Sequence, residues 1–495
     1  MPSTVAYGNI TKTLQLTPSR FLVLPLQASK AISRSHKQLH TMKTDVLIIG
    51  GGPGGSAMAM FLVREGIKPV ILEQEEFPRY HIGESMTGEG GQVLRRLGFE
   101  DEMIKREHPV KHGVRVFGTT GQNSWYVPVS SRDKEWNLSF STTWQVRRSD
   151  FDTMMLKEAE KRGATVMRGT ATKPLLANDG AVRGITVRWP DGKSEDIETQ
   201  MVLDCTGQAT FLANQRVTGP KYLGNYDKQV AFFSQVTGAV RGSADSGEHA
   251  KDNTLIFYAK KFHWSWFIPL DKDIVSVGMV TPNADFLAKK QTPEEFFRNE
   301  LYDINPELRN RIPDLNLVEK VHVIPNYSYQ VRGFCGKGFI CIGDAHRFID
   351  PIFSFGLTVT MREAEFAAPL VREYLEGKRR NGANPFADHQ VFCEQGIDNL
   401  EDMIDLFWEQ PFAFATFVYH RYPDQLTDAF AGRIYPTEHQ PSPAVGGFRK
   451  MLKRTREYDQ DDYSVPIGSR FHPERAAIWE PNSPVATTEQ WMGAR

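Results

Sequence analysis

Short apolar runs and helical stretches alternate along the chain from residue 45 onward. Residues 45–50 read DVLIIG, a β-branched apolar run that is typical of a buried strand. Residues 56–66 have a helical composition that ends at Gly66, and a second strand pattern, PVILE, follows at 69–73. This order predicts a βαβ unit near the start of an α/β fold.

Three glycines, Gly50, Gly52 and Gly55, occupy the predicted turn between the first strand and the helix in GxGxxG spacing. Gly50 permits the tight turn, Gly52 lets the backbone approach a pyrophosphate, and Gly55 lets helix and strand pack closely. The helix N-terminus offers free N–H groups to the phosphates. Glu73 ends the second strand, where it can accept hydrogen bonds from the adenosine ribose. A dinucleotide site is therefore predicted.

A second nucleotide contact far downstream favours FAD over a nicotinamide cofactor. The apolar strand pattern 339–342 ends in Gly343 and Asp344, which resembles the second FAD fingerprint of the hydroxylase and reductase flavoproteins. In that group the aspartate bonds the ribityl chain, Arg148 would lie near the flavin, and residues 204–208 would close a strand. The resemblance implies an α/β fold: a Rossmann-like FAD-binding domain with an inserted mixed β-sheet substrate domain and a C-terminal helical region.

The expected domains are unequal. Residues 45–370 form the FAD-binding domain with the interleaved β-sheet domain, and residues 371–495 form helices that cover the substrate side. Residues 1–44 hold several Lys and Arg but no Asp or Glu, so they are either an organelle transit peptide or the result of a start codon placed upstream of Met42. The expected location is the cytoplasm, or an organelle if the transit peptide is genuine.

Composition narrows the partners. Lys plus Arg number 59 and Asp plus Glu 60, so a net charge of -1 gives no electrostatic reason to expect nucleic acid or an acidic membrane. The four cysteines show no metal-binding spacing, and no apolar run reaches the roughly 18 residues of a membrane-spanning helix. We expect no metal and a small substrate.

Two further motifs narrow the chemistry. Trp264 and Trp266 lie in HWSWFIP with WxWxIP spacing, and residues 348–356 read FIDPIFSFG, which matches FxDPxxSxG and includes Pro351 and Ser354. Structurally these are also compatible with two core aromatics before a turn proline and with a loop before the helix predicted at 357–377. Together they resemble the flavin-dependent halogenases.

In that family the two tryptophans lie beside the flavin and disfavour direct oxygenation of the substrate. The resemblance also implies that chloride or bromide binds the backbone amides of Phe355 and Gly356, and the nearby helix N-terminus supplies the electrostatics. His346 and Arg347 are bulkier than the small residues expected beside the flavin.

Lys111 is singled out by the resemblance alone, as the catalytic lysine on a strand that follows a Gly83–Glu84 turn. Strand alternation puts it on the face of Gly113 and Arg115, which is also typical of a solvent-facing lysine. The implied mechanism uses reduced FAD and oxygen to make hypohalous acid, which Lys111 either hydrogen-bonds or converts to a haloamine. A lysine with a pKa of ~10.4 is protonated at neutral pH, so the haloamine would require burial.

The substrate class is narrowed by Phe353. Tryptophan-specific members of the family carry a glutamate there and a GEAT turn where this chain has Gly83–Glu84–Ser85. These features resemble the phenol and pyrrole halogenases, some of which act on carrier-tethered substrates, with a separate flavin reductase supplying reduced FAD. The alternatives are a monooxygenase or prenyl reductase of the same fold and a non-catalytic FAD-binding protein; WxWxIP together with Lys111 favours the halogenase.

Overall fold

The computed structural model describes residues 42–226, 228–379, 382–437, 439, 442–455 and 477–479. The prediction of a transit peptide or a misplaced start falls on residues outside this set, except for Met42, Lys43 and Thr44. These three already belong to the first strand, β1 (Met42–Ile49).

A mostly parallel sheet forms around β1, as the sequence predicted. β1 pairs in parallel with β2 (Val70–Glu73) on one side and β12 (Ser194–Asp204) on the other. The remaining strands of this sheet are β9 (Thr165–Arg168), β10 (Thr170–Leu176), β11 (Val182–Arg188), β21 (Cys335–Gly336) and β22 (Phe339–Cys341). β22 pairs in parallel with β12, so the two predicted nucleotide-binding segments end at the same edge of one sheet.

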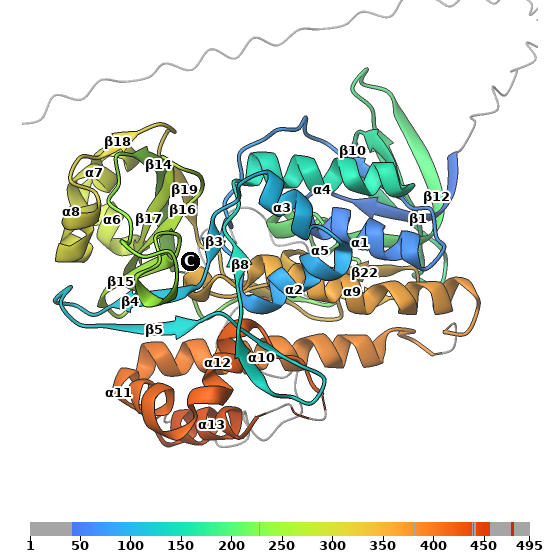
Figure 1. Ribbon diagram of the computed structural model, residues 1–495. Helices are drawn as coiled ribbons and strands as arrows, with labels where there is room; N and C mark the ends of the chain where they lie inside the picture. The colour runs from blue at the N-terminus through green and yellow to red at the C-terminus, as the bar shows by residue number, and fades with distance from the viewer. Residues whose placement is uncertain are drawn as a thin grey trace, which may run out of the picture. The chain divides into compact units, whose positions relative to one another are not determined.

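Three helices pack beside this sheet and against one another: α1 (Pro53–Arg64), α4 (Arg148–Arg162) and α9 (Gly356–Leu375). α1 packs against both of the other two (Figure 1). Val46, Leu47 and Ile48 have no exposed surface, and burying each such side chain contributes about 1.5–3 kcal/mol. The apolar run 46–49 is therefore a strand because it is buried on both faces, as parallel sheets require.

A second, mixed sheet carries the WxWxIP motif. Its strands are β4 (Gly113–Phe117), β5 (Ser124–Pro128), β14 (Gln229–Thr237), β15 (Thr254–Lys260), β16 (His263–Pro269), β17 (Val275–Pro282), β18 (Asn316–Leu317) and β19 (His322–Pro325). Along β16, Trp264, Trp266 and Ile268 enter one hydrophobic cluster, and Phe267 enters the cluster on the opposite face. Phe267 packs with α7 (Pro293–Ile304) and α8 (Pro306–Arg311).

Shorter elements join the two large sheets. β3 (Val110–Lys111) pairs with β8 (Thr143–Trp144), and α2 (Gly88–Leu97) contacts β8. The other short strands are β6 (Ser130–Arg132), β7 (Leu138–Phe140), β13 (Lys221–Leu223), β20 (Tyr329–Val331), β23 (Arg347–Phe348) and β24 (Ala477–Trp479). The remaining short helices are α3 (Glu100–Lys105), α5 (Phe211–Asn214) and α6 (Asn283–Lys289).

The C-terminal part is helical, as expected. It contains α10 (Ala387–Glu409), α11 (Pro411–Thr416), a π-helical turn at Phe417–Arg421, α12 (Pro423–Ala431) and α13 (Pro443–Thr455) (Figure 1). The expected domain boundaries at residues 45 and 370 both fall inside elements, in β1 and α9. The division into domains itself stays a prediction.

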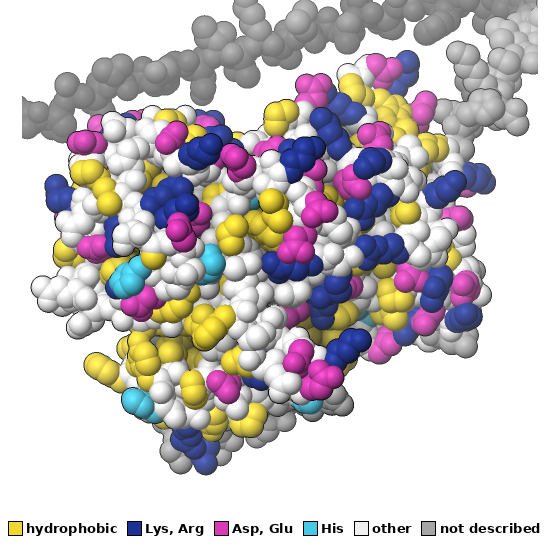
Figure 2. Space-filling model, in the orientation of Figure 1, with side chains coloured by type: hydrophobic (Ala, Val, Ile, Leu, Met, Phe, Trp, Pro, Cys, Tyr) yellow, Lys and Arg dark blue, Asp and Glu magenta, His cyan; other side chains and the backbone are white. Residues whose placement is uncertain are grey.

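The described helices include none that is both long and apolar enough to cross a membrane. Lys and Arg intermingle with Asp and Glu over the face that Figure 2 shows, in keeping with the near-zero net charge. All four cysteines are free thiols, and the described residues contain no cluster of His, Cys, Asp or Glu that could hold a metal ion.

Candidate active site

The glycine turn between β1 and α1 has the geometry that a pyrophosphate needs. Gly50 has φ +99°, and a Cβ there would lie 2.5 Å from the carbonyl oxygen of Cys205. A Cβ on Gly55 would lie 1.9 Å from the Gly50 carbonyl oxygen. Both positions therefore require glycine for packing. Gly52 differs, because a Cβ there would meet only Arg79 Nη2, at 3.4 Å.

The space beside Gly52 suits an anion. Gly52 is the N-cap of α1 and offers no side-chain cap, and among the described residues the amides of Gly52 and Gly54 donate to no backbone carbonyl. Arg79 adds a guanidinium that the sequence analysis did not single out. Glu73 is buried at the end of β2 and accepts from the Gly51 and Glu75 amides at 2.6 and 2.7 Å. Such a turn can hold the diphosphate of FAD.

Arg148 and Asp344 come from opposite ends of the FAD-binding region and interact electrostatically. Arg148 Nε and Nη2 donate to the two oxygens of Asp152 at 2.6 and 2.9 Å, and Nη1 donates to the Ile82 carbonyl at 2.5 Å. Burial raises the pKa of Asp344 to about 6, and the charge of Arg148 opposes that rise. No described residue donates a hydrogen bond to the Asp344 carboxylate, so it remains available to a ribityl hydroxyl.

His346 and Arg347, the two bulky departures from the family pattern, both pair with buried acids. Glu363 Oε2, on α9, accepts from His346 Nε2 at 2.9 Å and from the Gly343 amide at 2.7 Å. The His346 ring stacks on Phe334 at 3.8 Å. Arg347 contacts Glu401 on α10 at 2.5 Å. These large side chains tie the Gly343–Asp344 turn to two helices.

The two tryptophans of WxWxIP are buried neighbours on one face of β16. Their ring centroids lie 5.7 Å apart at 45°. Trp266 Nε1 donates to Ser276 Oγ at 3.2 Å, and Trp264 Nε1 has no hydrogen-bond partner among the described residues. Both belong to the hydrophobic cluster that contains Phe353 and Phe355. The alternative reading as core aromatics therefore describes their packing correctly.

The FIDPIFSFG segment forms a capped turn before α9. Asp350 accepts from the Ile352 amide at 3.1 Å and from Trp408 Nε1 at 3.2 Å, and burial raises its pKa to about 7. Pro351 begins a short 3-10 turn, and Ser354 has φ +64°. This conformation presents the amides of Phe355 and Gly356 at the N-terminus of α9, where they donate to no backbone carbonyl of the described residues. Such an end can bind a halide.

The Gly83–Glu84–Ser85 turn connects the tryptophan motif with Lys111. The Glu84 carboxyl group is hydrogen-bonded by Ser276, whose Oγ also accepts from Trp266, and burial raises the pKa of Glu84 to about 7. On the next residue, Ser85 Oγ accepts from Lys111 Nζ at 2.9 Å. In the sequence, this turn distinguishes substrate classes but does not indicate these contacts.

Lys111 is buried, and the solvent-facing reading suggested by strand alternation is wrong. The residue is 1 % exposed: its strand β3 pairs with β8, and Ser85 and Met86 lie against its amine. Nζ donates to Ser85 Oγ and, at 3.0 Å, to the Met86 carbonyl. Burial lowers the pKa of Lys111 to about 7, so the neutral amine is accessible near neutral pH.

Comparisons with known proteins agree with this geometry. Residues 43–383 match the model of the family described as FAD binding domain. A 1H-pyrrole-2-carbonyl-[peptidyl-carrier protein] brominase of Pseudoalteromonas luteoviolacea is 32% identical over 417 residues, covering 84% of this chain and 97% of the relative. The corresponding chlorinase of Pseudomonas fluorescens is 29% identical over 411 residues, covering 79% and 89%.

Among solved structures, the flavin-dependent brominase Bmp2 aligns with a TM-score of 0.75 and 30% identity, over 83% of this chain and 99% of Bmp2. The chain belongs to the flavin-dependent halogenases. Its cofactor is FAD, and the halogenase reading prevails over the monooxygenase, reductase and non-catalytic alternatives.

The structure of this halogenase brings together most of the residues that the sequence singled out. Gly50, Gly52 and Gly55 form one turn, Glu73 accepts from the amide of Gly51 within that turn, and the charge of Arg148 acts on the Asp344 carboxylate. Sequence reasoning missed Arg79, and it gave no role to Glu84 or to the Ser85 hydroxyl. The Gly83–Glu84–Ser85 turn was noticed, but nothing in the sequence indicated that its side chains contact Lys111 and Ser276.

Proposed function

We propose that this halogenase transfers chlorine or bromine to a pyrrole-type ring presented on a carrier protein, with Lys111 as the residue that delivers the halogen. The observation that carries the proposal is the buried Lys111 with its hydrogen bonds to Ser85 and Met86. The two relatives named for carrier-bound pyrrole substrates support the choice of substrate.

Phe353 favours an aromatic substrate that lacks the charged ammonium and carboxylate groups of a free amino acid. Its side chain is 1 % exposed and packs against Phe430 and Phe407 at 4.8 and 5.2 Å between ring centroids. Trp125 also contacts it, at 6.5 Å. No carboxylate stands at this position to fix the ammonium or indole N–H of tryptophan.

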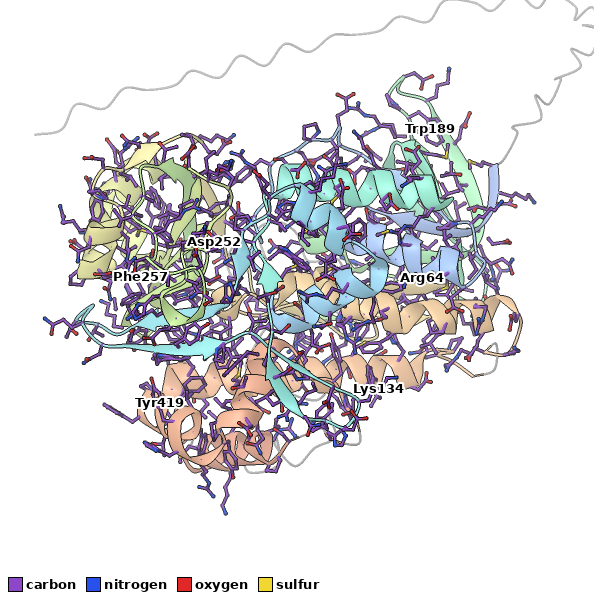
Figure 3. All side chains as sticks on the ribbon, in the orientation of Figure 1. Arg64, Lys134, Trp189, Asp252, Phe257 and Tyr419 are labelled. Atoms are coloured by element: carbon purple, nitrogen blue, oxygen red, sulfur yellow. The ribbon has the colours of Figure 1, made fainter. Side chains whose placement is uncertain are left out.

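An apolar cleft adjoins these rings. Trp125 and Phe414 line it together with Tyr419, which lies in the π-helical turn after α11 and is labelled in Figure 3. Hydrophobic side chains gather on the face over β5 and the neighbouring helices in Figure 2. We infer that this cleft guides the aromatic substrate, which is the role expected for the C-terminal region.

The chemistry divides between two places. When bound, reduced FAD together with oxygen supplies the oxidising equivalent that converts halide to hypohalous acid. The amides of Phe355 and Gly356 hold the halide at the N-terminus of α9, and the Gly50–Gly55 turn, Glu73, Arg148 and Asp344 hold the cofactor. Trp264 and Trp266 would lie beside the cofactor and disfavour direct oxygenation of the ring substrate.

Lys111 then acts on hypohalous acid in one of two ways. As a neutral amine it forms an N–halogen bond and releases water, and ring attack then forms the carbon–halogen bond, returns the N–halogen electron pair to nitrogen and releases the ring proton. As an ammonium it donates a hydrogen bond to the oxygen of hypohalous acid, which leaves as water. The lowered pKa of Lys111 makes the first route accessible.

A reconstituted assay tests the substrate. The FAD-loaded enzyme is incubated with a flavin reductase, NADH, oxygen and bromide, and with either pyrrole-2-carbonyl carrier protein, free pyrrole-2-carboxylate or free tryptophan. We expect mass spectrometry to find bromine on the carrier-bound pyrrole in preference to both free compounds. Oxygenated product, or bromination of free pyrrole at an equal rate, would contradict the proposal.

The reductase is tested by omission. We expect the pure protein not to reduce its FAD with NADH, because the sequence offers no second nucleotide fingerprint for a nicotinamide. Rapid bleaching of the bound flavin by NADH alone would indicate a self-sufficient enzyme.

A further inference from the structure

The Lys111 nitrogen has a defined set of protein partners. Ser85 Oγ lies 2.9 Å away and the Met86 carbonyl oxygen 3.0 Å away, and no other described residue accepts from Nζ. A neutral amine has two N–H bonds and an ammonium has three. The two acceptors therefore fix the orientation of the nitrogen and leave its third direction to a reactant.

The Ser85 hydroxyl is itself held from the far side. Thr254 Oγ1, at the start of β15, lies 2.9 Å from Ser85 Oγ, and Gln145 Nε2 donates to Thr254 Oγ1 at 2.8 Å. Gln145 Nε2 also donates to the carbonyl of Asp252, which Figure 3 labels, at 3.1 Å. Lys111 and Thr254 thus meet at the Ser85 hydroxyl, and Gln145 in turn holds Thr254. Ser85 itself is only 4 % exposed.

Charged groups around Lys111 are engaged elsewhere. Burial alone accounts for its lowered pKa, and strand β8 opposite it carries Thr143 and Trp144. The titratable side chains of the surrounding elements pair with other partners: Glu84 with Gln235 and Ser276, Glu89 with Arg433, Arg95 with Glu100, Arg96 with Glu365, Asp252 with Arg241, and His108 with Asp150. His112 lies next to Lys111 in the chain and interacts with Asp252.

We propose that Ser85, supported by Thr254, is a positioning residue that orients the Lys111 nitrogen for halogen transfer. The proposal rests on the proposed role of Lys111 and adds a second residue to the delivery stage. Ser85 touches the amine and not the reacting halogen, so its loss should misdirect hypohalous acid without preventing its formation.

The experiment measures where the halogen goes. In the FAD-loaded enzyme with reductase, oxygen and bromide, hypobromous acid that escapes is trapped by monochlorodimedone, and the brominated ring is counted by mass spectrometry. The ring is whichever pyrrole or phenol the wild-type enzyme accepts. We expect Ser85→Ala to cut ring product about tenfold, because one oriented hydrogen bond to an amine is lost, while total bromide oxidation is kept.

A pH profile separates positioning from general damage. A hydroxyl acceptor stabilises the ammonium more than the amine. Removing it should therefore lower the apparent pKa of Lys111, read from the pH dependence of ring halogenation, by about one unit. Ser85→Thr keeps the hydroxyl. It should restore both the wild-type ratio of ring product to trapped hypobromous acid and the wild-type apparent pKa in the pH profile. Thr254→Val, which leaves Ser85 in place, should give a smaller change in the same direction.

Ser234→Ala is the matched control, since it removes another buried serine hydroxyl, bonded to the Glu319 carbonyl on the far side of the second sheet. It should keep the wild-type partition. The proposal would be overturned if Ser85→Ala and Thr254→Val both kept the wild-type ratio of ring product to trapped hypobromous acid and the wild-type pH profile. It would also be overturned if Ser234→Ala lost as much ring product as Ser85→Ala. Lys111→Ala measured alongside distinguishes the two hypotheses: if it retains ring bromination, the role of Lys111 fails; if it loses it and Ser85→Ala does not, only the positioning role fails.

Discussion

The phosphate turn and the Lys111 pocket are built in opposite ways. The turn comes from one stretch of chain, residues 50–55, and its geometry is set by backbone that tolerates no Cβ at Gly50 or Gly55. The Lys111 pocket is assembled from residues 85–86, β3, β8 and the start of β15, with hydrogen bonds that span up to 169 positions in sequence. A local motif therefore marks the first, whereas long-range packing creates the second.

Gly52→Val should have the largest effect, because it puts a side chain into the space where the phosphate turn would hold the pyrophosphate. A Cβ there meets only Arg79 within the protein, so we expect the variant to fold and yet to lose FAD and all halogenation. Flavin absorbance after gel filtration, with circular dichroism for folding, measures this. Gly446→Val in α13, where a Cβ meets nothing within 4 Å, is the control and should keep its FAD. Normal flavin content in folded Gly52→Val would refute the phosphate-turn assignment.

Lys111→Ala tests the assembled region. Ring halogenation should fall by about 10² to 10⁴-fold, the usual cost of losing a catalytic proton donor or acceptor, while FAD binding and halide oxidation continue. Lys111→Met keeps most of the buried volume and should lose as much product, which separates the amine from a cavity effect. If both variants halogenate at the wild-type rate, Lys111 is only a core residue.

Substrate choice depends on a third place, the aromatic cluster around Phe353. Phe353 puts a phenyl ring where tryptophan enzymes of the family place a carboxylate, so kcat/KM for carrier-bound pyrrole should exceed that for free tryptophan by on the order of 10². Competition between the two substrates, followed by mass spectrometry, measures the ratio. Efficient chlorination of free tryptophan at a single position would show that the Phe353 argument is wrong.

The pH dependence should show the smallest effect. The pKa of Lys111 is lowered to about 7, so its neutral fraction changes about tenfold from one pH unit below that value to one above. If the amine is halogenated, the rate rises with pH through this range; if the ammonium donates a hydrogen bond, the rate falls. Lys111→Arg stays charged and cannot titrate there, so any remaining limb near pH 7 belongs to another group, such as Glu84 or Asp350, whose pKa values also lie at about 7.

His346 and Arg347 have partners that a comparison of side-chain sizes does not reveal. In the sequence they are only bulkier than the small residues expected beside the flavin. In the structure His346 pairs with Glu363 on α9 and Arg347 with Glu401 on α10, and the burial of these polar side chains is tolerated because each has a hydrogen-bonding partner. Those partners lie in segments that no local pattern connects to residues 346 and 347.

The βαβ unit, the glycine turn, the second fingerprint at Gly343–Asp344 and the helix after Gly356 can all be predicted from the amino-acid sequence. Each depends on apolar periodicity or on backbone conformations that few residues can adopt, and residues close together in the sequence carry both signals. The burial of Lys111 and the hydrogen bond from its amine to Ser85 depend on tertiary contacts. Strand alternation gives two faces but does not say what covers them. Here β8 pairs with the strand of Lys111, Ser85 and Met86 accept hydrogen bonds from its amine, and burial lowers its pKa.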